Sequence, residues 1–197
     1  LRASEARGTI NAGQYGGRAG LEAQSLVFLE EVKTEISTLS RKSLINFDND
    51  AASCYDRIIP SLASLIGRKK GLHTNVVYVH ATTLREAKYK LKTAMGVSDD
   101  FYTHCSSYPI YGTGQGSTNS PVIWIIISST LFDIHNQRAH GAYFCSPDQS
   151  TSISFSIVGF VDDLRLLSGY SKENAWAVAR FILSRLQYLG IQDEPRK

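Results

Sequence analysis

The chain has 197 residues, of which 43% are hydrophobic, and this is enough to bury a core and suits one domain. Its net charge of +3 is a mild basic excess, well short of the strongly basic character of a dedicated DNA-binding module. The most apolar window, 121–131, is too short to cross a membrane, and the first residues do not have the pattern of a signal peptide.

The cysteines also limit the class of protein. Cys54, Cys105 and Cys145 are odd in number and widely spaced, with no CxxC pair. This pattern argues against a disulfide framework or a zinc site and favours a reducing compartment. We therefore expect an intracellular protein of the nucleus or cytoplasm that is not secreted.

Hydrophobic periodicity, helix caps and turn residues predict the secondary structure. Helices are expected over residues 21–39, 56–70, 75–94, 120–138 and 171–189. Strands are expected over 44–50 and 106–111 and in a hairpin whose arms are 153–160 and 164–167, with a loop over 141–151 before it. Helices that alternate with a few mainly antiparallel strands predict an α+β fold, with a small sheet packed on helices.

A first group of acidic residues follows the strand predicted over 44–50. Side chains alternate along a strand, so Asp48 and Asp50 project from the same face at its end. An aromatic side chain shortly after such a carboxylate, here Tyr55, can lie beside whatever the carboxylate binds. The alternative is an acidic strand-to-helix turn, with Asp56 near a helix N-terminus, where negative charge is favoured.

A glycine-rich loop over 111–119 leads into the helix predicted from residue 120. Glycines allow a close approach of backbone to a ligand, and Ser120-Pro121 is a good helix start. Free backbone N–H groups at such a place can bind phosphate, although an ordinary capped loop has the same composition. The loop is not a Walker loop, because no Gly-Lys-Ser/Thr follows at the required spacing.

Asp162 and Asp163 lie at the tip of the predicted hairpin. Two adjacent carboxylates repel each other, which is costly unless a cation lies between them. Ligation by oxygen alone favours Mg²⁺ or Mn²⁺. Taken by itself, an Asp-Asp pair in a surface turn is also ordinary turn chemistry.

In this order, the three segments resemble the palm motifs of a reverse transcriptase, most like the non-LTR retroelement type. Asp50 through Tyr55-Asp56 resembles motif A, Gln115-Gly116-Ser117 with Ser120-Pro121 resembles motif B, and Phe160-Val161-Asp162-Asp163 resembles motif C. Upstream, residues 14–20 resemble the fingers segment that usually reads Gln-Phe-Gly-Phe-Arg-Pro-Gly, with Tyr15 in place of the first Phe and with departures at Gly17 and Ala19. Val161 stands where alanine is commoner in non-LTR enzymes.

The resemblance implies an RNA-directed DNA polymerase that transfers deoxynucleotides to a primer 3′-hydroxyl by a two-metal mechanism. Asp50, Asp162 and Asp163 would be the catalytic carboxylates and would hold two Mg²⁺ ions, or Mn²⁺. The backbone carbonyl of Ala51 would be a further metal ligand.

Residues that bind the substrate follow from the same resemblance. Tyr55 would lie under the sugar of the incoming nucleotide and exclude a 2′-hydroxyl; the alternative is a core aromatic. Gln115 and Gly116 would contact the nucleotide and the templating base. Arg18 would meet the triphosphate, because its planar fork suits phosphate oxygens.

The implied organisation is a partial fingers region over 1–42 and a palm over 43–197, with no identifiable thumb. Such a fragment would lack much of the grip on template and primer, so we expect it to be weak or inactive by itself. The implied partners are an RNA template, a DNA or RNA primer and deoxynucleoside triphosphates, with no membrane. Basic residues at 68–70, 85–92 and 196–197 could contact a phosphate backbone or simply form solvated helix faces.

Two other functions share parts of this pattern. An RNA-dependent RNA polymerase has the same palm, but its third motif usually begins Gly-Asp-Asp, and an aromatic gate at Tyr55 argues against the use of ribonucleotides. A degenerate palm could bind only RNA or a protein partner. Retention of all three carboxylates argues against that alternative, because a binding module does not need to hold repelling charges together.

Overall fold

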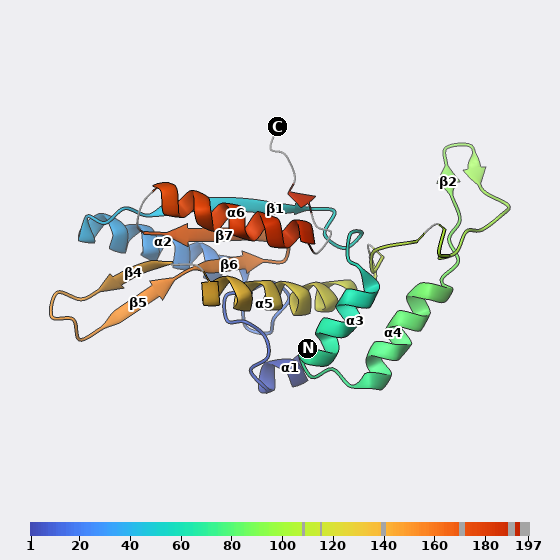
Figure 1. The fold of residues 1–197 in the computed structure, drawn as a ribbon, viewed down its shortest axis with the longest axis horizontal. Helices are drawn as coiled ribbons and strands as arrows, with labels where there is room; N and C mark the ends of the chain where they lie inside the picture. The colour runs from blue at the N-terminus through green and yellow to red at the C-terminus, as the bar shows by residue number, and fades with distance from the viewer. Residues whose placement is uncertain (108, 115, 139–140, 170–171, 189–191, 194–197) are drawn as a thin grey trace.

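The computed structural model describes residues 1–197 except 108, 115, 139–140, 170–171, 189–191 and 194–197 (Figure 1). The helices are α1 (Arg2–Ala6), α2 (Ala23–Ser40), α3 (Pro60–Lys69), α4 (Thr74–Glu86), α5 (Ser120–Arg138) and α6 (Lys172–Tyr188). The strands are β1 (Ile45–Ala52), β2 (Lys92–Thr93), β3 (Gly96–Val97), β4 (Ala142–Cys145), β5 (Ser152–Phe155), β6 (Ile157–Phe160), β7 (Asp163–Ser168) and β8 (Gln192–Asp193). The fold is α+β, as the sequence predicts.

The central sheet has four strands in the order β6-β7-β1-β8, and all neighbours are antiparallel. β6 and β7 form the tip half of the predicted hairpin. Its first arm, predicted over 153–160, is divided, because residues 152–155 form β5 and pair with β4 instead. β7 then pairs with β1, from Ile45 opposite Ser168 to Asp50 opposite Asp163. The pairing joins segments that lie far apart in the sequence, and it therefore fixes which acidic residues meet.

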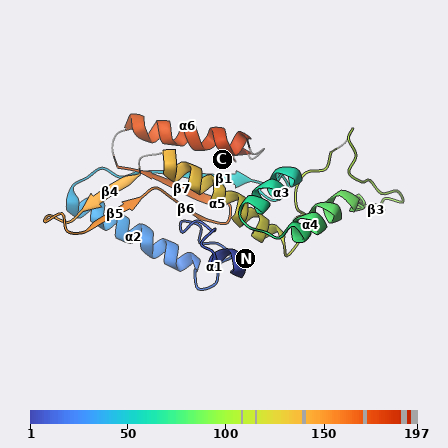
Figure 2. The ribbon, with the colours of Figure 1, turned by 60° about the horizontal axis from the view of Figure 1, so that its bottom comes forward.

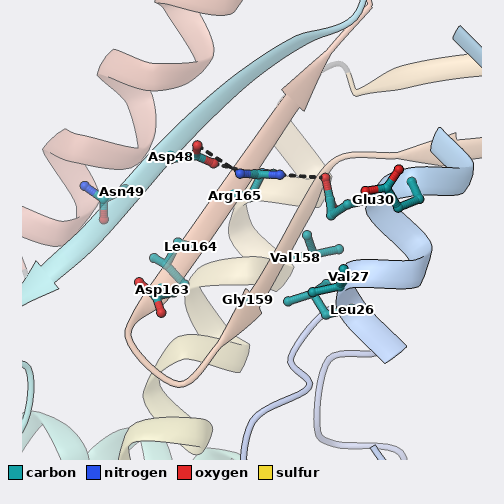
Figure 3. Close-up of a pocket in the computed structure, with 11 residues that line it drawn as sticks. Leu26, Val27, Glu30, Asp48, Asn49, Val158, Gly159, Asp163, Leu164 and Arg165 are labelled. Atoms are coloured by element: carbon teal, nitrogen blue, oxygen red, sulfur yellow. Dashed lines mark hydrogen bonds and ion pairs between the residues drawn. The ribbon is translucent and has the colours of Figure 1, made fainter. Parts of the chain in front are cut away.

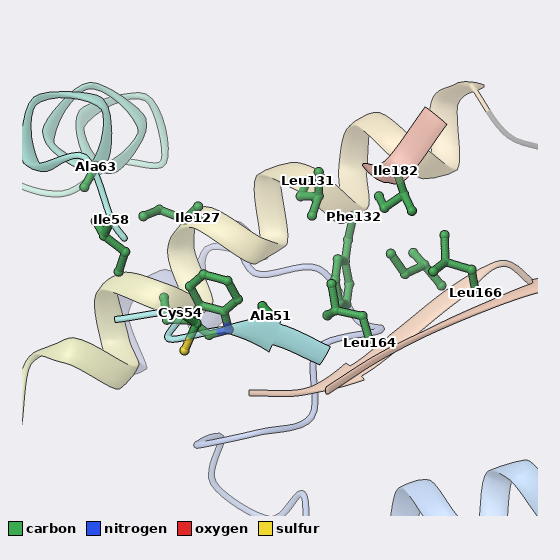
Figure 4. Packing of buried hydrophobic residues seen from close by; sticks show 12 residues of the cluster. Ala51, Cys54, Ile58, Ala63, Ile127, Leu131, Phe132, Leu164, Leu166 and Ile182 are labelled. Atoms are coloured by element: carbon green, nitrogen blue, oxygen red, sulfur yellow. The ribbon is translucent and has the colours of Figure 1, made fainter. Parts of the chain in front are cut away.

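Alternation along the strands gives the sheet two apolar faces. On one face, Leu164 and Leu166 pack with Phe132 of α5 and Ile182 of α6 (Figure 4). On the other face, Leu167 belongs to a cluster that includes the β4–β5 hairpin and the inner side of α2. The sheet is therefore enclosed between α5 and α6 on one side and α2 on the other (Figure 2).

Helix α5 has the predicted bounds and is buried along most of its length, including the isoleucine run 125–127. A β-branched run favours a strand, but a helix that is apolar all round is stable when neighbours cover it on every side. Strands β6 and β7, helices α3 and α6 and the segment around Ile10 provide most of that cover. In the part of the chain that the structure describes, no helix combines the length and the apolar character that crossing a membrane requires.

Two predicted helices are shorter than expected. The helix predicted from residue 56 begins at Pro60, which lacks an N–H and suits the first turn. The helix predicted over 75–94 ends at Glu86, because Ala87 takes an extended conformation. Beyond it, Tyr89 pairs with Tyr102 and their rings stack, so the segment forms the base of the short β2–β3 arm instead.

Two further predictions on the way to the hairpin were wrong. The described residues of 106–111 form no strand; the Ile110 N–H instead donates to His104 Nδ1 (2.9 Å). The loop predicted over 141–151 is partly β4, which pairs with β5 and buries Phe144 against Phe155. The last helix, α6, agrees with its prediction, while its predicted cap and end, Ser171 and Gly190, lie outside the described residues.

The buried His135 gives a pH-dependent stability. It lies in α5 beside Phe181 with 0% exposure, and neither ring nitrogen has a hydrogen-bond partner among the described residues. Burial lowers the pKa of His135 from 6.5 to about 4. The unfolded chain therefore binds this proton more readily between those values, and stability is lost as pH falls through that window.

We expect the free energy of unfolding to drop by about 2 kcal/mol more between pH 7 and pH 5 in the wild type than in His135→Leu. Urea unfolding of both proteins at the two pH values measures this difference. The other histidines are common to both proteins, so their contributions cancel. Equal pH dependence in the two proteins would contradict the assignment.

Candidate active site

The end of the β1–β7 ladder brings the predicted acidic residues together along the backbone. Asp50 is directly opposite Asp163, and the Ala51 N–H donates to the carbonyl of Asp162 (3.3 Å). β1 contains Asp50 of the segment that resembles motif A, and β7 begins at Asp163 of the segment that resembles motif C. The two carboxylate sites recognised in the sequence therefore lie at one corner of the sheet.

The side chains at this corner point to different surroundings. Asp162 lies beside the buried Cys54, whose thiol donates to its Oδ2 (3.9 Å). Asp163 is exposed and lines a cavity of about 400 Å³ between α2 and the β6–β7–β1 edge (Figure 3). Among the residues that the structure describes, no three His, Cys, Asp or Glu side chains form a ready metal-binding group.

The donor chemistry nevertheless suits a hard divalent cation. Asp50, Asp162 and Asp163 offer carboxylate oxygens only, from adjacent backbone positions. Burial first, and then Asp162, raise the pKa of the neighbouring Cys54 thiol to about 12, and sulfur is in any case a soft ligand that suits Mg²⁺ poorly. The residues thus fit Mg²⁺ by their chemistry, and their side chains would have to turn toward one another to share it.

Asp48 has a different role from Asp50, although the two share a face of β1. Arg165 donates to both carboxylate oxygens of Asp48, with 3.0 Å between Nη2 and Oδ2. Arg165 also contacts Glu30 of α2 (3.2 Å; Figure 3). Glu30 in turn pairs with the buried Lys33 (2.6 Å). Asp48 therefore links the sheet to α2 through Arg165, although it lines the same cavity as Asp163.

The tip of the hairpin is stabilised by Gln14, Gly16 and Trp124, for which the sequence predicts no role at the site. Val161 has φ of 58°, a left-handed conformation that is costly for a β-branched residue. Its carbonyl accepts from Trp124 Nε1 and from Nε2 of the fully buried Gln14 (3.4 Å). A Cβ on Gly16 would lie 2.4 Å from the Val161 nitrogen, so only glycine fits there.

The sequence contained a partial signal for this support. Gln14 and Gly16 belong to the segment that resembles a reverse transcriptase fingers motif, and Gln14 is an uncharged polar residue. Nothing local to the sequence, however, indicates that Gln14 and Trp124 meet at Val161. That contact depends on α5 crossing beneath the hairpin.

Tyr55 and the glycine-rich loop are directly connected. The Thr113 N–H donates to the carbonyl of Tyr55 (3.0 Å), and a Cβ on Gly112 would lie 2.8 Å from the Asp56 Cα. Tyr55 is half-buried and packs against the main core cluster, and burial raises the pKa of its hydroxyl. Its position is compatible with both predicted roles, a core aromatic and a neighbour of the acidic corner.

The structure gives less support to the other predicted substrate contacts, Gln115, Gly116 and Arg18. Gln115 lies outside the described residues, and Gly116 is exposed in the loop before α5. Arg18 binds Glu5 (3.0 Å) and the carbonyls of Asn11 (3.2 Å) and Gln14 (2.9 Å). These contacts stabilise the N-terminal segment, so a role at a triphosphate stays a prediction.

Comparison with known proteins supports the fold. No protein-family model and no curated protein sequence matches the chain. Among solved structures, telomerase from Candida albicans, in complex with a TWJ fragment of telomeric RNA, is similar with a TM-score of 0.62 at 15% identity, over 88% of this chain and 29% of that one. The chain has a reverse transcriptase-like fold.

Two structures from Candida tropicalis agree. Telomerase with the same kind of RNA fragment gives a TM-score of 0.62 at 12% identity, over 92% of this chain and 29% of that one. Apo telomerase truncated from its C-terminal domain gives 0.58 at 13% identity, over 94% and 37%. The chain thus spans well under half of each telomerase chain, and at these identities the reverse transcriptase-like fold is what is shared; the likeness to the non-LTR type stays a prediction.

The different roles of Asp48 and Asp50 can be tested by stability. Asp48→Asn breaks the ion pair with Arg165, and we expect it to lower the free energy of unfolding by about 1–2 kcal/mol. Asp50→Asn removes one of two like charges opposite each other, and we expect a change within about 0.5 kcal/mol, or a slight gain. Urea unfolding of both variants at pH 7 measures the contrast; an Asp50→Asn loss equal to that of Asp48→Asn would refute it.

The protected state of Cys54 predicts selective alkylation. At pH 8, iodoacetamide should modify the exposed Cys105 and Cys145 and react with Cys54 at least about 100 times more slowly. Mass spectrometry of timed samples counts the labels, with denatured protein as the control that labels all three. Asp162→Asn should raise the alkylation rate of Cys54 only slightly, because burial is the larger cause of the raised thiol pKa. Fast labelling of native Cys54 would show that this thiol is not buried.

Proposed function

We propose that the chain is the fingers–palm part of an RNA-directed DNA polymerase, which adds deoxynucleotides to a primer 3′-hydroxyl. The observation that carries the proposal is the register of β1 and β7, which sets Asp50 opposite Asp163 and Asp162 beside Ala51 within a reverse transcriptase-like fold. Similar solved structures include telomerases in complex with telomeric RNA, which supports RNA as a partner.

In this proposal Asp50, Asp162 and Asp163 hold Mg²⁺, with the Ala51 carbonyl as a further donor. Bound there, two such ions would supply Lewis-acid activation of the primer hydroxyl and neutralisation of charge at the α-phosphate. The chain's own part is to position the groups that react, and positioning with electrostatics carries most of a phosphoryl transfer. No covalent nucleophile is needed.

The neighbouring residues would choose the nucleotide. Tyr55 follows the Asp50 strand end and is bound through its carbonyl to Thr113. Its ring would lie against the sugar and disfavour a 2′-hydroxyl. The loop carrying Gln115 and Gly116 would contact the base and the template, and Arg18 would reach the triphosphate after releasing Glu5.

The proposal predicts loss of metal binding and of primer extension in the same variants. Binding of Mn²⁺, followed by its electron paramagnetic resonance signal, should weaken about tenfold or more in Asp50→Asn and Asp162→Asn. Extension of a DNA primer on an RNA template, measured with the chain joined to a thumb, should fall about 100-fold or more in Asp50→Asn, Asp162→Asn and Asp163→Asn. Asp99→Asn, which changes an exposed carboxylate of the β2–β3 arm, is the matched control and should behave as wild type.

Metal binding and activity that are the same in wild type and in all three variants would overturn the polymerase assignment. The chain by itself is expected to be weak or inactive, so this outcome is judged only on the protein joined to a thumb. A thumb-bearing wild type that binds Mn²⁺ through these residues but extends no primer would instead indicate a degenerate palm. A comparison of deoxynucleotides with ribonucleotides separates the RNA polymerase alternative. Wild type should prefer deoxynucleotides, and Tyr55→Val should reduce that preference about tenfold or more.

A further inference from the structure

Residues 13–15 run beside β6 at the edge of the central sheet. The Tyr15 N–H donates to the carbonyl of Gly159 (2.8 Å), and the Gly159 N–H donates to the carbonyl of Gly13 (2.9 Å). These two hydrogen bonds form a parallel bridge that sets Gln14 beside Gly159. The backbone of Gln14 is therefore fixed next to the strand that leads into the tip of the hairpin.

The side-chain amide of Gln14 is fully buried and is hydrogen-bonded through both its nitrogen and its oxygen. Nε2 donates to Ser128 Oγ (2.8 Å) and to the carbonyl of Val161 (3.4 Å). Oε1 accepts from the Gly16 N–H (3.2 Å). A carbonyl can only accept and a backbone N–H can only donate, so these partners allow one orientation of the amide. Its donor therefore faces the Val161 carbonyl.

The Val161 carbonyl belongs to the peptide that joins Val161 to Asp162, and it has a second donor in Trp124 Nε1 of α5. Val161 has φ of 58°, which a β-branched residue adopts only under constraint. A turn relaxed at Val161 would rotate this peptide and redirect Asp162, whose own carbonyl accepts from the Ala51 N–H. The two donors therefore favour the turn conformation in which Asp162 lies at the acidic corner.

We propose that Gln14 is a positioning residue for the metal site. Together with the Trp124 indole, its amide keeps the peptide between Val161 and Asp162 in the orientation that sets Asp162 and Asp163 for Mg²⁺. The effect on metal rests on the proposed function, whereas the hold on the turn does not. Without the amide, the turn spends part of its time relaxed, and metal affinity falls by the fraction of chains that stay competent to bind.

Metal affinity gives the first test. Gln14→Met keeps the length of the side chain and removes its donor. Binding of Mn²⁺, followed by electron paramagnetic resonance, should weaken about three- to tenfold, because the relaxed turn then competes with the binding one. The control for lost stability is Ser37→Ala, which deletes another buried hydrogen bond, to the carbonyl of Lys42 after α2 (2.6 Å). Ser37→Ala should leave Mn²⁺ affinity unchanged within about twofold.

Hydrogen exchange of the Trp124 indole N–H, followed by NMR without metal, gives the second test. Trp124 is 1% exposed and donates to the Val161 carbonyl, whereas Trp176 of α6 is 52% exposed and is the reference in the same spectrum. Exchange at Trp124 should be at least about tenfold faster in Gln14→Met than in wild type. Ser37→Ala, in enough urea to match the stability of Gln14→Met, should exchange this proton at least about fivefold more slowly than Gln14→Met, because its turn does not open locally.

The strain at Val161 gives a test that a merely structural role for Gln14 would not pass. Glycine adopts the left-handed conformation at little cost, so the turn of Val161→Gly needs less support. In that background, Gln14→Met should weaken Mn²⁺ binding less than about twofold. Trp124→Phe removes the other donor to the same carbonyl and should weaken Mn²⁺ binding about three- to tenfold. Thermal unfolding shows which variants are folded, and Trp124→Phe decides the outcome if Gln14→Met is not.

Three results would overturn the positioning role. These are wild-type Mn²⁺ affinity in folded Gln14→Met, equal Trp124 exchange in Gln14→Met and the matched Ser37→Ala, and the same loss on Gln14→Met whether residue 161 is valine or glycine. A wild type that binds no Mn²⁺ through the three carboxylates would instead refute the proposed function and the effect on metal. Trp124 exchange would still decide whether Gln14 holds the turn, so the two failures are distinguishable.

Discussion

The antiparallel pairing of β1 with β7 is the constraint on which the rest of the molecule depends. It joins the strand that ends at Asp50 to the strand that begins at Asp163. A slip of one residue would turn every side chain of one strand to the other face. Leu164 and Leu166 would then leave the core beneath α5 and α6, so the apolar packing that stabilises the sheet also fixes the register of the acidic residues.

The turn that carries Asp162 and Asp163 has an unfavourable backbone conformation, and surrounding residues stabilise it. Val161 takes a left-handed conformation, and such strain costs of the order of 1–3 kcal/mol. Gln14 and Trp124 hold its carbonyl, and Gly16 leaves room for its nitrogen. Two segments far apart in the chain, residues 14–16 and helix α5, thus hold one turn, and backbone strain of this kind is concentrated at functional sites.

Charge is distributed unequally along the same strand face. Asp48 is satisfied by Arg165 and through it is joined to Glu30 on α2. Asp50, two residues further along, is instead set opposite another carboxylate. An acidic residue that is neutralised within the protein serves stability, while a like-charged pair suits an external cation. This contrast, together with the motif spacing, supports the proposal that Asp50 and not Asp48 binds metal.

Local patterns in the sequence determined much of the fold. Periodicity predicted α2 and β1, the cap and length predicted α5, and two apolar runs around Asp162-Asp163 predicted the β6–β7 hairpin, because these features depend on neighbours in the chain. The expectation that Asp50 would meet that hairpin came from the resemblance to reverse transcriptase motifs. Tertiary structure decided what depends on distant partners. The stacking of Tyr89 on Tyr102 accompanies the early end of α4, and burial of Phe144 against Phe155 made a hairpin of a predicted loop. The binding of Asp48 by Arg165, of Arg18 by Glu5 and of Val161 by Gln14 and Trp124 likewise required the folded chain, because a hydrogen bond between residues far apart leaves no periodic trace in the sequence.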